Sequence, residues 1–314
     1  MYRFIFKSFI LFISLFLLTM SLYPYLDNKL RKTNYSINYK EWDDIIESKI
    51  NADLLIQGSS RAWVHISPRY LDSSLKLNSY NLGLDGYQFH MQYSRFLLYL
   101  KYNKKPKYIL QIADYVTLWK TKDLYMYEQF IPFLNEEIID KAVLEYRGLN
   151  KMDIYVPAYR YIHNNSVYFN GLLTYLDDSQ SNGKYKGFQA QNKLWTSNFR
   201  DYKKVNPNGD KYDVDTMTLR LFDTFIRYCI KENIKLIFVN PPSYYESTKL
   251  LTNRTLIDSI YHHYTVKYNL PFLDYSNDAI CMDTANFYNA GHLNATGVQK
   301  FNLILAKDLS KIIK

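Results

Sequence analysis

Five short apolar runs, separated by helix-forming segments, constrain the fold of this chain most strongly. The runs cover Asp53–Gln57, Leu77–Leu84, Lys107–Ile112, Lys235–Val239 and Pro271–Tyr275. Strands that alternate with helices form βαβ units, in which the strands are parallel and the crossovers right-handed. The alternation therefore predicts one five-stranded parallel sheet with helices packed against it.

The segments between these runs show the periodicity of helices with one buried face. Phe89, Tyr93 and Phe96, for example, recur at helical spacing, and Asn294 is a plausible N-cap for the closing helix. The predicted helices cover 87–102, Met217–Asn233, Thr252–Tyr268 and a closing segment from Val298 onward, with a short one at Glu41–Ile50. We therefore predict an α/β chain with a flavodoxin-like three-layer sandwich.

A stretch of nineteen uncharged residues, Ser8–Leu26, dominates the N-terminal part of the chain. As a helix it would span about 28 Å, close to the hydrocarbon thickness of a bilayer. The sequence at its exit, Met20-Ser-Leu-Tyr-Pro-Tyr, lacks the small-residue pattern of a signal-peptide cleavage site. We therefore expect an uncleaved, single-pass membrane anchor. Basic residues on both sides of it leave its orientation undecided.

These patterns divide the chain into a membrane anchor (1–26), a juxtamembrane segment (27–49) and an α/β domain (50–314). The domain carries an insertion at about 120–212, which is rich in Tyr, Asn and Gly and is expected to hold one or two helices around 135–162. Such a segment is too long for a plain connection. It is either a lid or substrate platform, or a decoration without a role in binding.

The chain is basic, with 39 Lys and Arg, 30 Asp and Glu, and a net charge of +9. This balance is typical either of a basic soluble surface or of a protein that meets an acidic membrane or an acidic polymer. No run of five like charges and no nucleic-acid-binding motif accompanies it, so we expect no nucleic-acid partner. The two cysteines, Cys229 and Cys281, do not fix a redox compartment, and a disulfide between them stays open.

Two polar segments far apart in the sequence are expected at the same edge of the sheet. Gly58-Ser59-Ser60 directly follows the first apolar run, and His292 lies between the last run and the closing helix. Ligands of open α/β sheets bind at the carboxyl ends of the strands. A serine hydroxyl is a weak nucleophile until a base removes its proton, so Ser60 and His292 are the candidate nucleophile and base.

Three motifs, in this order, resemble the sequence blocks of the SGNH (GDSL-like) hydrolase superfamily. Gly58-Ser59-Ser60 is similar to the first block, Asn81-Leu-Gly83-Leu-Asp85-Gly86 to the second, and Asn289-Ala-Gly-His292-Leu-Asn to the fifth. The resemblance covers roughly residues 50–314. It implies that Ser60 is the nucleophile and His292 the base, and that the N–H groups of Ser60 and Gly86 bind the oxyanion.

Two positions depart from the superfamily pattern. The aspartate that normally holds the histidine is Asn289, which can orient the ring but brings no charge. The third block normally supplies an oxyanion-hole asparagine; this chain has Asp114 there, and a carboxylate would repel an oxyanion. Either a Ser–His dyad suffices, or another acid such as Asp283 assists, or the protein is slow or inactive.

The other polar candidates carry weaker signals. Arg61, beside Ser60, is expected either to contact an anionic substrate or to pair with an acid. His65 is expected to be a packing or surface residue. His262 and His263 would point about 100° apart on a helix and make a poor metal pair. No Walker, Rossmann or zinc signature occurs, so we expect no metal and no cofactor.

The motifs together with the N-terminal anchor are closest to a membrane-anchored branch that includes alginate O-acetylation and teichoic-acid D-alanylation proteins. That resemblance implies an extracytoplasmic esterase or O-acyltransferase that acts on acyl groups of a cell-surface or exported polysaccharide, with a membrane acyl-donor protein as a further partner. The alternative is a catalytically weak or inactive glycan-binding or assembly subunit, for which the abundance of tyrosine suits sugar stacking.

Overall fold

The computed structural model describes residues 1–33, 35–36, 38–174 and 183–313. The chain divides into two compact units: Met1–Glu47 with Thr121–Asn182, and Ser48–Lys120 with Gly183–Lys314. The first part of the expected insertion therefore clusters with the N-terminal segment, and its last part with the sheet. The domain boundaries given above remain a prediction.

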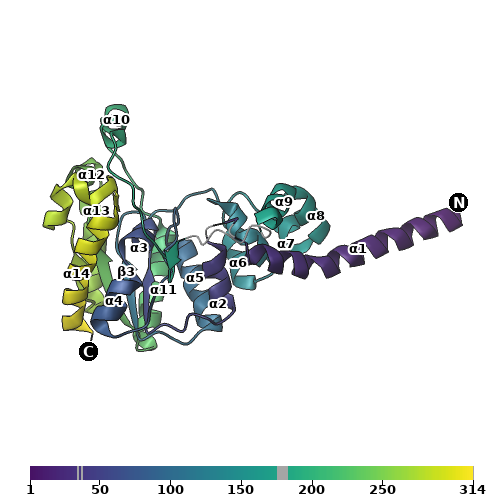
Figure 1. Cartoon of the computed structure of the whole chain (residues 1–314), viewed down its shortest axis with the longest axis horizontal. Coiled ribbons are helices and arrows are strands. Elements are labelled where there is room, and N and C mark those ends of the chain that lie inside the picture. The colour runs from purple at the N-terminus through teal and green to yellow at the C-terminus, as the bar shows by residue number, and fades with distance from the viewer. Residues whose placement is uncertain (34, 37, 175–182, 314) are drawn as a thin grey trace. The chain divides into compact units, whose positions relative to one another are not determined.

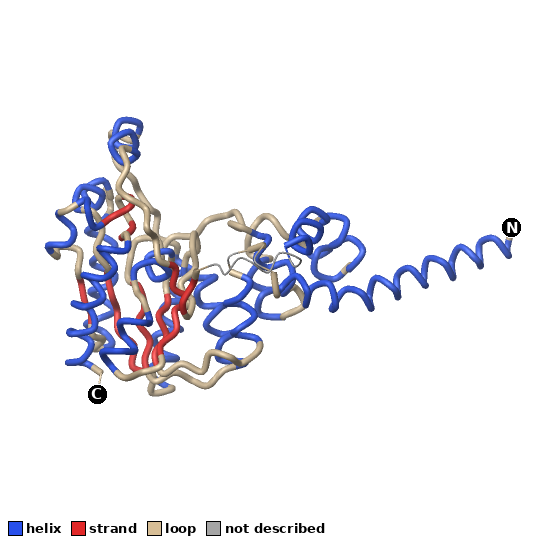
Figure 2. Tube along the Cα trace, viewed as in Figure 1, coloured by secondary structure: helices blue, strands red, loops and turns tan. Residues whose placement is uncertain are grey.

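The second unit is built on a five-stranded parallel sheet (Figure 2). Its strands are β1 (Leu54–Gln57), β2 (Ser79–Asn81), β3 (Tyr108–Ile112), β6 (Lys235–Asn240) and β7 (Phe272–Asp274). Their order is β2-β1-β3-β6-β7, and every neighbouring pair is parallel; Leu54 lies opposite Ser79 on one side and Tyr108 on the other. This is the flavodoxin-like strand order, so the predicted fold class is confirmed.

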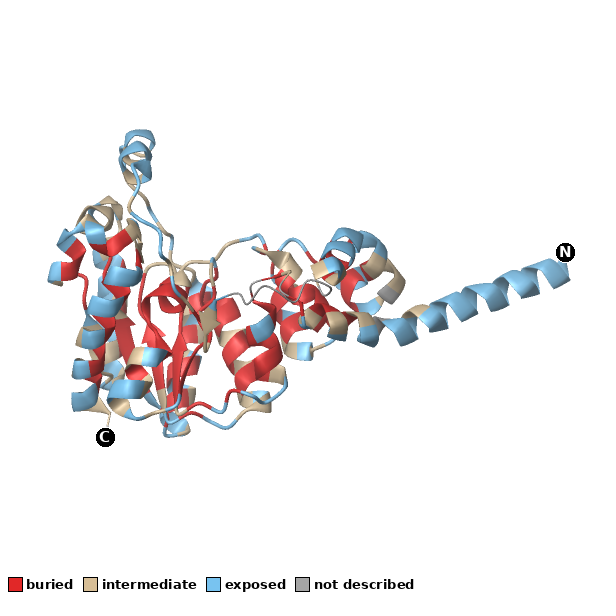
Figure 3. Cartoon of the chain, in the orientation of Figure 1, coloured by how far each residue is buried: buried red, intermediate tan, exposed pale blue. Residues whose placement is uncertain are grey.

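Alternate residues of the strands pack against helices on opposite faces of the sheet. Ile56, Leu110 and Ile237 belong to the core that includes α3 (Ser60–His65), α4 (Pro68–Leu75) and α14 (Ala295–Ile312). On the other face, Phe238 contacts Phe222 of α11 (Thr216–Lys231) and Tyr261 of α13 (Arg254–Tyr268). The helix α5 (Phe89–Tyr102) joins this aromatic core through Phe89. Helices on both faces complete the three-layer sandwich, in which the sheet is the most buried layer (Figure 3).

The remaining elements of this unit are short. They are the hairpin β4 (Lys184–Tyr185) with β5 (Phe188–Gln189), α10 (Asn198–Val205), α12 (Tyr245–Leu250), the 3₁₀ turns η2 (Ala279–Met282) and η3 (Thr284–Asn286), and the hairpin β8 (Phe287–Asn289) with β9 (His292–Leu293). Figure 1 shows α10 at the end of two extended connections. None of its residues is buried.

The first unit is helical. It contains α1 (Tyr2–Arg31), α2 (Tyr39–Ile46), η1 (Tyr127–Phe133), α6 (Glu137–Val143), α7 (Lys151–Tyr155), α8 (Pro157–His163) and α9 (Asn165–Thr174). The last turns of α1 are tied to α8 and α9, because Asp27 pairs with Arg160 at 3.3 Å and accepts the Tyr168 hydroxyl at 2.6 Å. The expectation of one or two helices around 135–162 is too low, since α6, α7 and α8 have only five to seven residues each, too few to show a hydrophobic periodicity.

Within the described residues, α1 is the one helix long and apolar enough to cross a membrane. Most of its length is exposed (Figure 3), and large apolar side chains such as Phe12 and Leu17 face solvent along it. An uncovered apolar surface of this kind favours a lipid environment. The predicted N-terminal helix is confirmed; its insertion in a membrane is part of the proposal below.

Candidate active site

Ser60 stands where the first strand of the sheet gives way to a helix. β1 ends at Gln57, Ser59 caps α3 by accepting the Arg61 N–H at 3.4 Å, and half-buried Ser60 opens that helix. The turn between them needs Gly58, because a Cβ there would lie 2.6 Å from the Cβ of Ile112. The chain therefore turns tightly at the carboxyl edge of the sheet and presents the serine there.

The structure brings Ser60 and His292 together across 232 positions of sequence. His292 begins β9, and its Nε2 lies 2.8 Å from the Ser60 Oγ. That is hydrogen-bond distance for a serine and its general base. The two residues that the sequence singles out as nucleophile and base have the geometry these roles require.

Asn289 occupies the position of the missing aspartate and contacts the histidine. Its Oδ1 lies 2.9 Å from His292 Nδ1 and accepts the Gly291 N–H at 3.0 Å. Because the Gly291 N–H can only donate, the Asn289 atom that faces both groups is the amide oxygen. His292 then carries its proton on Nδ1, and Nε2 is free to accept the serine proton. Asn289 orients the ring as a carboxylate would, without the charge.

The surroundings of His292 favour the neutral imidazole. Burial, and then the Arg61 guanidinium, lower the pKa of His292 to about 4. Asp283, the acid considered as a substitute, accepts the Ala285 N–H and caps η3. No carboxylate among the described residues forms a hydrogen bond or ion pair with His292, so the imidazolium formed during catalysis would have no counter-ion.

The side chain of Arg61 is buried and forms an ion pair with Asp114. It is 5% exposed, pairs with Asp114 at 3.5 Å and donates to the Pro241 carbonyl. Asp114 also accepts the Ser59 hydroxyl at 3.2 Å. One carboxylate thus binds both sequence neighbours of Ser60, and its role here is structural. Contact between Arg61 and substrate remains a prediction.

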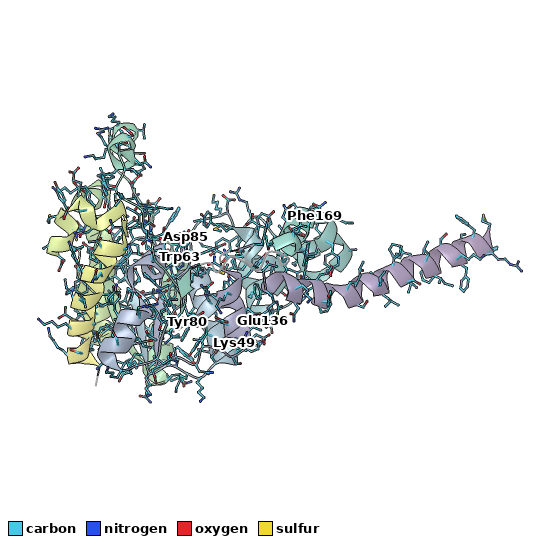
Figure 4. All side chains as sticks on the ribbon, in the orientation of Figure 1. Lys49, Trp63, Tyr80, Asp85, Glu136 and Phe169 are labelled. Carbon is cyan, nitrogen blue, oxygen red and sulfur yellow. The ribbon has the colours of Figure 1, made fainter. Side chains whose placement is uncertain are left out.

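The backbone N–H of Gly86, expected to bind the oxyanion, has another partner in this structure. Gly86 is exposed, has a φ of 72°, and its N–H bonds the Asp85 carboxylate. Burial raises the pKa of Asp85, against the opposing effects of that N–H and Lys184. Figure 4 shows Asp85 and Trp63 at the same end of the sheet unit. The Ser60 and Gly86 donors remain a prediction, which requires Asp85 to release Gly86.

Three residues that the sequence does not assign to the site support it, and one of them, His65, is a packing residue as expected. Tyr288 stacks on His292 with ring centroids 5.5 Å apart. His65, fully buried, accepts the Leu293 N–H through Nε2 at 3.1 Å and packs edge-on against His292. Asn81 donates to the carbonyl of Ala62 in α3 and to that of Ile66, which directly follows α3, both at 2.7 Å. The Asn81 contacts could have been sought from its place in the second motif; the others depend on tertiary structure.

A cavity of about 360 Å³ lies beside this pair within the same unit. Arg61, Asn289 and Gly291 contribute to its wall, whereas Ser60 and His292 do not line it. No group of three or more His, Cys, Asp or Glu suited to a metal ion occurs in the described ranges. Cys229 and Cys281 are both buried free thiols.

No protein-family model and no curated protein matches the chain. Solved structures with a similar fold include a protein provisionally named an acylhydrolase from Bacteroides fragilis, with 11% identity, 88% of this chain and 95% of that chain covered, and a TM-score of 0.39. A provisionally named lipolytic protein of the G-D-S-L family from Desulfitobacterium hafniense has 12% identity, coverage of 83% and 98%, and a TM-score of 0.40. A GDSL-like lipase from Bacteroides thetaiotaomicron has 11% identity, coverage of 89% and 98%, and a TM-score of 0.40.

Two of these three descriptions carry the GDSL name of the superfamily that the sequence motifs resemble. On its own evidence the chain has an α/β fold in the flavodoxin-like strand order, with Ser60 shortly after β1 and His292 shortly before the last helix. The membrane-anchored branch within that superfamily remains a prediction.

Proposed function

We propose that this chain is a membrane-anchored serine esterase or O-acyltransferase that acts on acyl groups of a cell-surface or exported polysaccharide. The observation that carries the catalytic part is the Ser60–His292–Asn289 arrangement, with its two contacts of 2.8 and 2.9 Å. The helix α1 supports the membrane part, and an extracytoplasmic sheet unit would meet such a substrate.

The proposed reaction has two acyl-transfer steps. His292 Nε2 takes the Ser60 proton as Oγ attacks the acyl carbonyl, and the same proton passes to the departing alcohol oxygen when the C–O bond breaks. A water or sugar hydroxyl then gives its proton to His292 and attacks the acyl-serine ester. The proton returns to Oγ, and the product is a free acid or a new ester.

Turnover of p-nitrophenyl acetate by the full chain in detergent tests the catalytic part. Ser60→Ala should abolish turnover and labelling by a fluorophosphonate probe, because it removes the hydroxyl that lies at hydrogen-bond distance from His292 Nε2. Ser74→Ala, an exposed serine on α4, is the matched control and should retain both. Equal rates for Ser60→Ala and the unmodified chain would overturn the proposal.

The uncharged Asn289 and the engaged Gly86 N–H favour one other function, a non-catalytic glycan-binding or assembly subunit on the same fold. In that case glycan binding would persist in Ser60→Ala while the unmodified chain showed neither turnover nor probe labelling. The same two assays therefore separate the two functions.

A further inference from the structure

The cavity beside the catalytic pair has the dimensions and lining of a ligand site. Its volume of about 360 Å³ lies within the range of small-molecule sites, roughly 300–1,000 Å³. We infer that it binds one pyranose ring of a neutral polysaccharide; the link of this binding to acyl transfer rests on the function proposed above.

Aromatic side chains form one wall of the cavity. Tyr115 and Tyr212 pack with ring centroids 4.6 Å apart, and α10 adds Phe199 and Tyr202. All four side chains keep part of their surface exposed. Aromatic rings combine an apolar face with, in tyrosine, a polar tip. Such a wall can stack on the C–H face of a sugar while the hydroxyl groups bond to it.

Both cations of the cavity are paired with carboxylates. Arg61 pairs with Asp114 at 3.5 Å, and Arg254 pairs with Asp258 at 3.3 Å. Asp210 accepts the Tyr202 hydroxyl at 2.6 Å. The described lining residues thus hold two cations and three carboxylates, with no excess positive charge. A phosphate or a uronic acid would be repelled here, whereas neutral hydroxyl groups can bond to both signs.

One donor of Arg61 is left for a ligand. Its Nε is buried and has no hydrogen-bond partner among the described residues, although the residue lines the cavity. A buried donor without a partner is unfavourable, and a ligand oxygen would satisfy it. Further polar side chains such as Ser243 line the same space beside apolar ones such as Leu251, and a sugar ring, with polar edges and apolar faces, matches such a mixture.

The position of the cavity would couple sugar binding to the base. Asn289 lines the cavity and orients His292, and Arg61 follows Ser60 directly. The helix α10, which contributes Phe199 and Tyr202 to the lining, has no buried residue. It is fixed by the Tyr202–Asp210 bond, the Lys203–Glu246 ion pair and the contact of Phe199 with Tyr244. Opening of α10 would admit an internal ring of a polymer.

The test uses the full-length Ser60→Ala chain in detergent micelles, titrated calorimetrically with cellotetraose, maltotetraose and chitotetraose. At least one should bind saturably, and Tyr212→Ala should weaken it about tenfold or more, whereas Tyr212→Phe keeps the stacking face. Tyr202→Ala, on the exposed helix α10, should also weaken binding, because it removes a ring of the lining and the hydroxyl that holds α10 to Asp210. Tyr70→Ala, a half-exposed tyrosine of α4 outside the cavity, should bind as the parent does.

Three outcomes would overturn the inference. They are no saturable binding of any of these sugars at millimolar concentration, unchanged binding by both Tyr212→Ala and Tyr202→Ala, and tighter binding of tetragalacturonate or octanoate. Failure of the proposed function is read separately, because it appears as absent turnover in the unmodified chain while sugar binding to Ser60→Ala persists.

Discussion

Asn289 replaces a carboxylate by an amide of nearly the same shape. Its oxygen is fixed by the Gly291 N–H, so it still selects the tautomer of His292 that can accept the serine proton. What the substitution removes is a counter-charge for the imidazolium. Because burial and Arg61 also disfavour the charged ring, the base is available at neutral pH but weak.

Asn289→Asp should therefore raise activity. A carboxylate beside Nδ1 favours the imidazolium, so the pKa of His292 should rise and kcat on p-nitrophenyl acetate should increase by about tenfold or more. Asn289→Ala, which removes the orienting oxygen, should lower kcat. The acid limb of the pH–rate profile gives an independent check, since an unchanged limb in Asn289→Asp would contradict this account.

The pH–rate profile of the unmodified chain is a second prediction. His292 must be neutral to take the serine proton, and its pKa is lowered to about 4. The value of kcat/KM should fall below that pH and stay level through the range in which an ordinary histidine, with a pKa of 6.5, titrates. An acid limb centred near 6.5 would show that the ring is not desolvated in solution.

The lowered pKa of His292 also makes the free energy of unfolding depend on pH. Between about 4 and 6.5 the unfolded chain binds a proton at His292 that the folded chain does not, so this residue's contribution is present above 6.5 and is lost as pH falls toward 4. Denaturant unfolding should show a smaller loss over this window for His292→Gln than for the parent. An equal loss of unfolding free energy in His292→Gln and in the parent would contradict the lowered pKa of His292.

At the scale of elements, the helix α3 is positioned by two close approaches of backbone. A Cβ at Gly58 would meet Ile112, and one at Gly83 would lie 2.3 Å from the Trp63 backbone nitrogen. Asn81 reinforces the second approach through its bonds to two carbonyls of this segment. The place of the nucleophile therefore depends on glycines outside the catalytic residues.

Gly83→Ala should displace α3 and destabilise the sheet unit by about 1–3 kcal/mol, the usual cost of overpacking. The matched control is Gly291→Ala, where the nearest atom to a new Cβ is 3.8 Å away. Thermal unfolding followed by circular dichroism compares the two. Similar unfolding midpoints for Gly83→Ala and Gly291→Ala would contradict this account, because they would mean that the loop after β2 moves to make room for the new Cβ.

The sequence predicts the order and number of the strands because most of them are apolar runs bounded by polar turn residues, although β2 (Ser79–Asn81) is shorter than the expected Leu77–Leu84. β3 and β6 differ from the expected ranges by one residue at one end. Ser60 and His292 follow from position, since the carboxyl edge of a parallel sheet brings both segments together. The hairpin β8–β9 and the helix α10 are too short to show periodicity. For Arg61 the sequence leaves two roles open, a contact with substrate or an ion pair with an acid. The partner, Asp114, cannot be predicted because the pair depends on how the chain packs.

At the scale of the whole molecule, α1 gives the chain a test of membrane anchoring. Leu17→Arg places a charge near the centre of the apolar stretch, where it opposes insertion by about 2.5–3.5 kcal/mol. The share of chain retained in carbonate-washed membranes should fall several-fold. Tyr2→Arg, exposed at the end of the same helix, is the control and should stay with the membrane. Equal retention of both variants would argue that α1 does not span the bilayer.

Asp114 binds both Ser59 and Arg61, the two sequence neighbours of the nucleophile. These contacts indicate one source of the rate enhancement in this chain. The backbone on both sides of the nucleophile is immobilised when the protein folds, so little reorganisation remains when the acyl carbonyl arrives. Fixed geometry of this kind lowers the entropic part of an activation barrier. A site that lacks one charge can in this way keep preorganisation as its main source of rate.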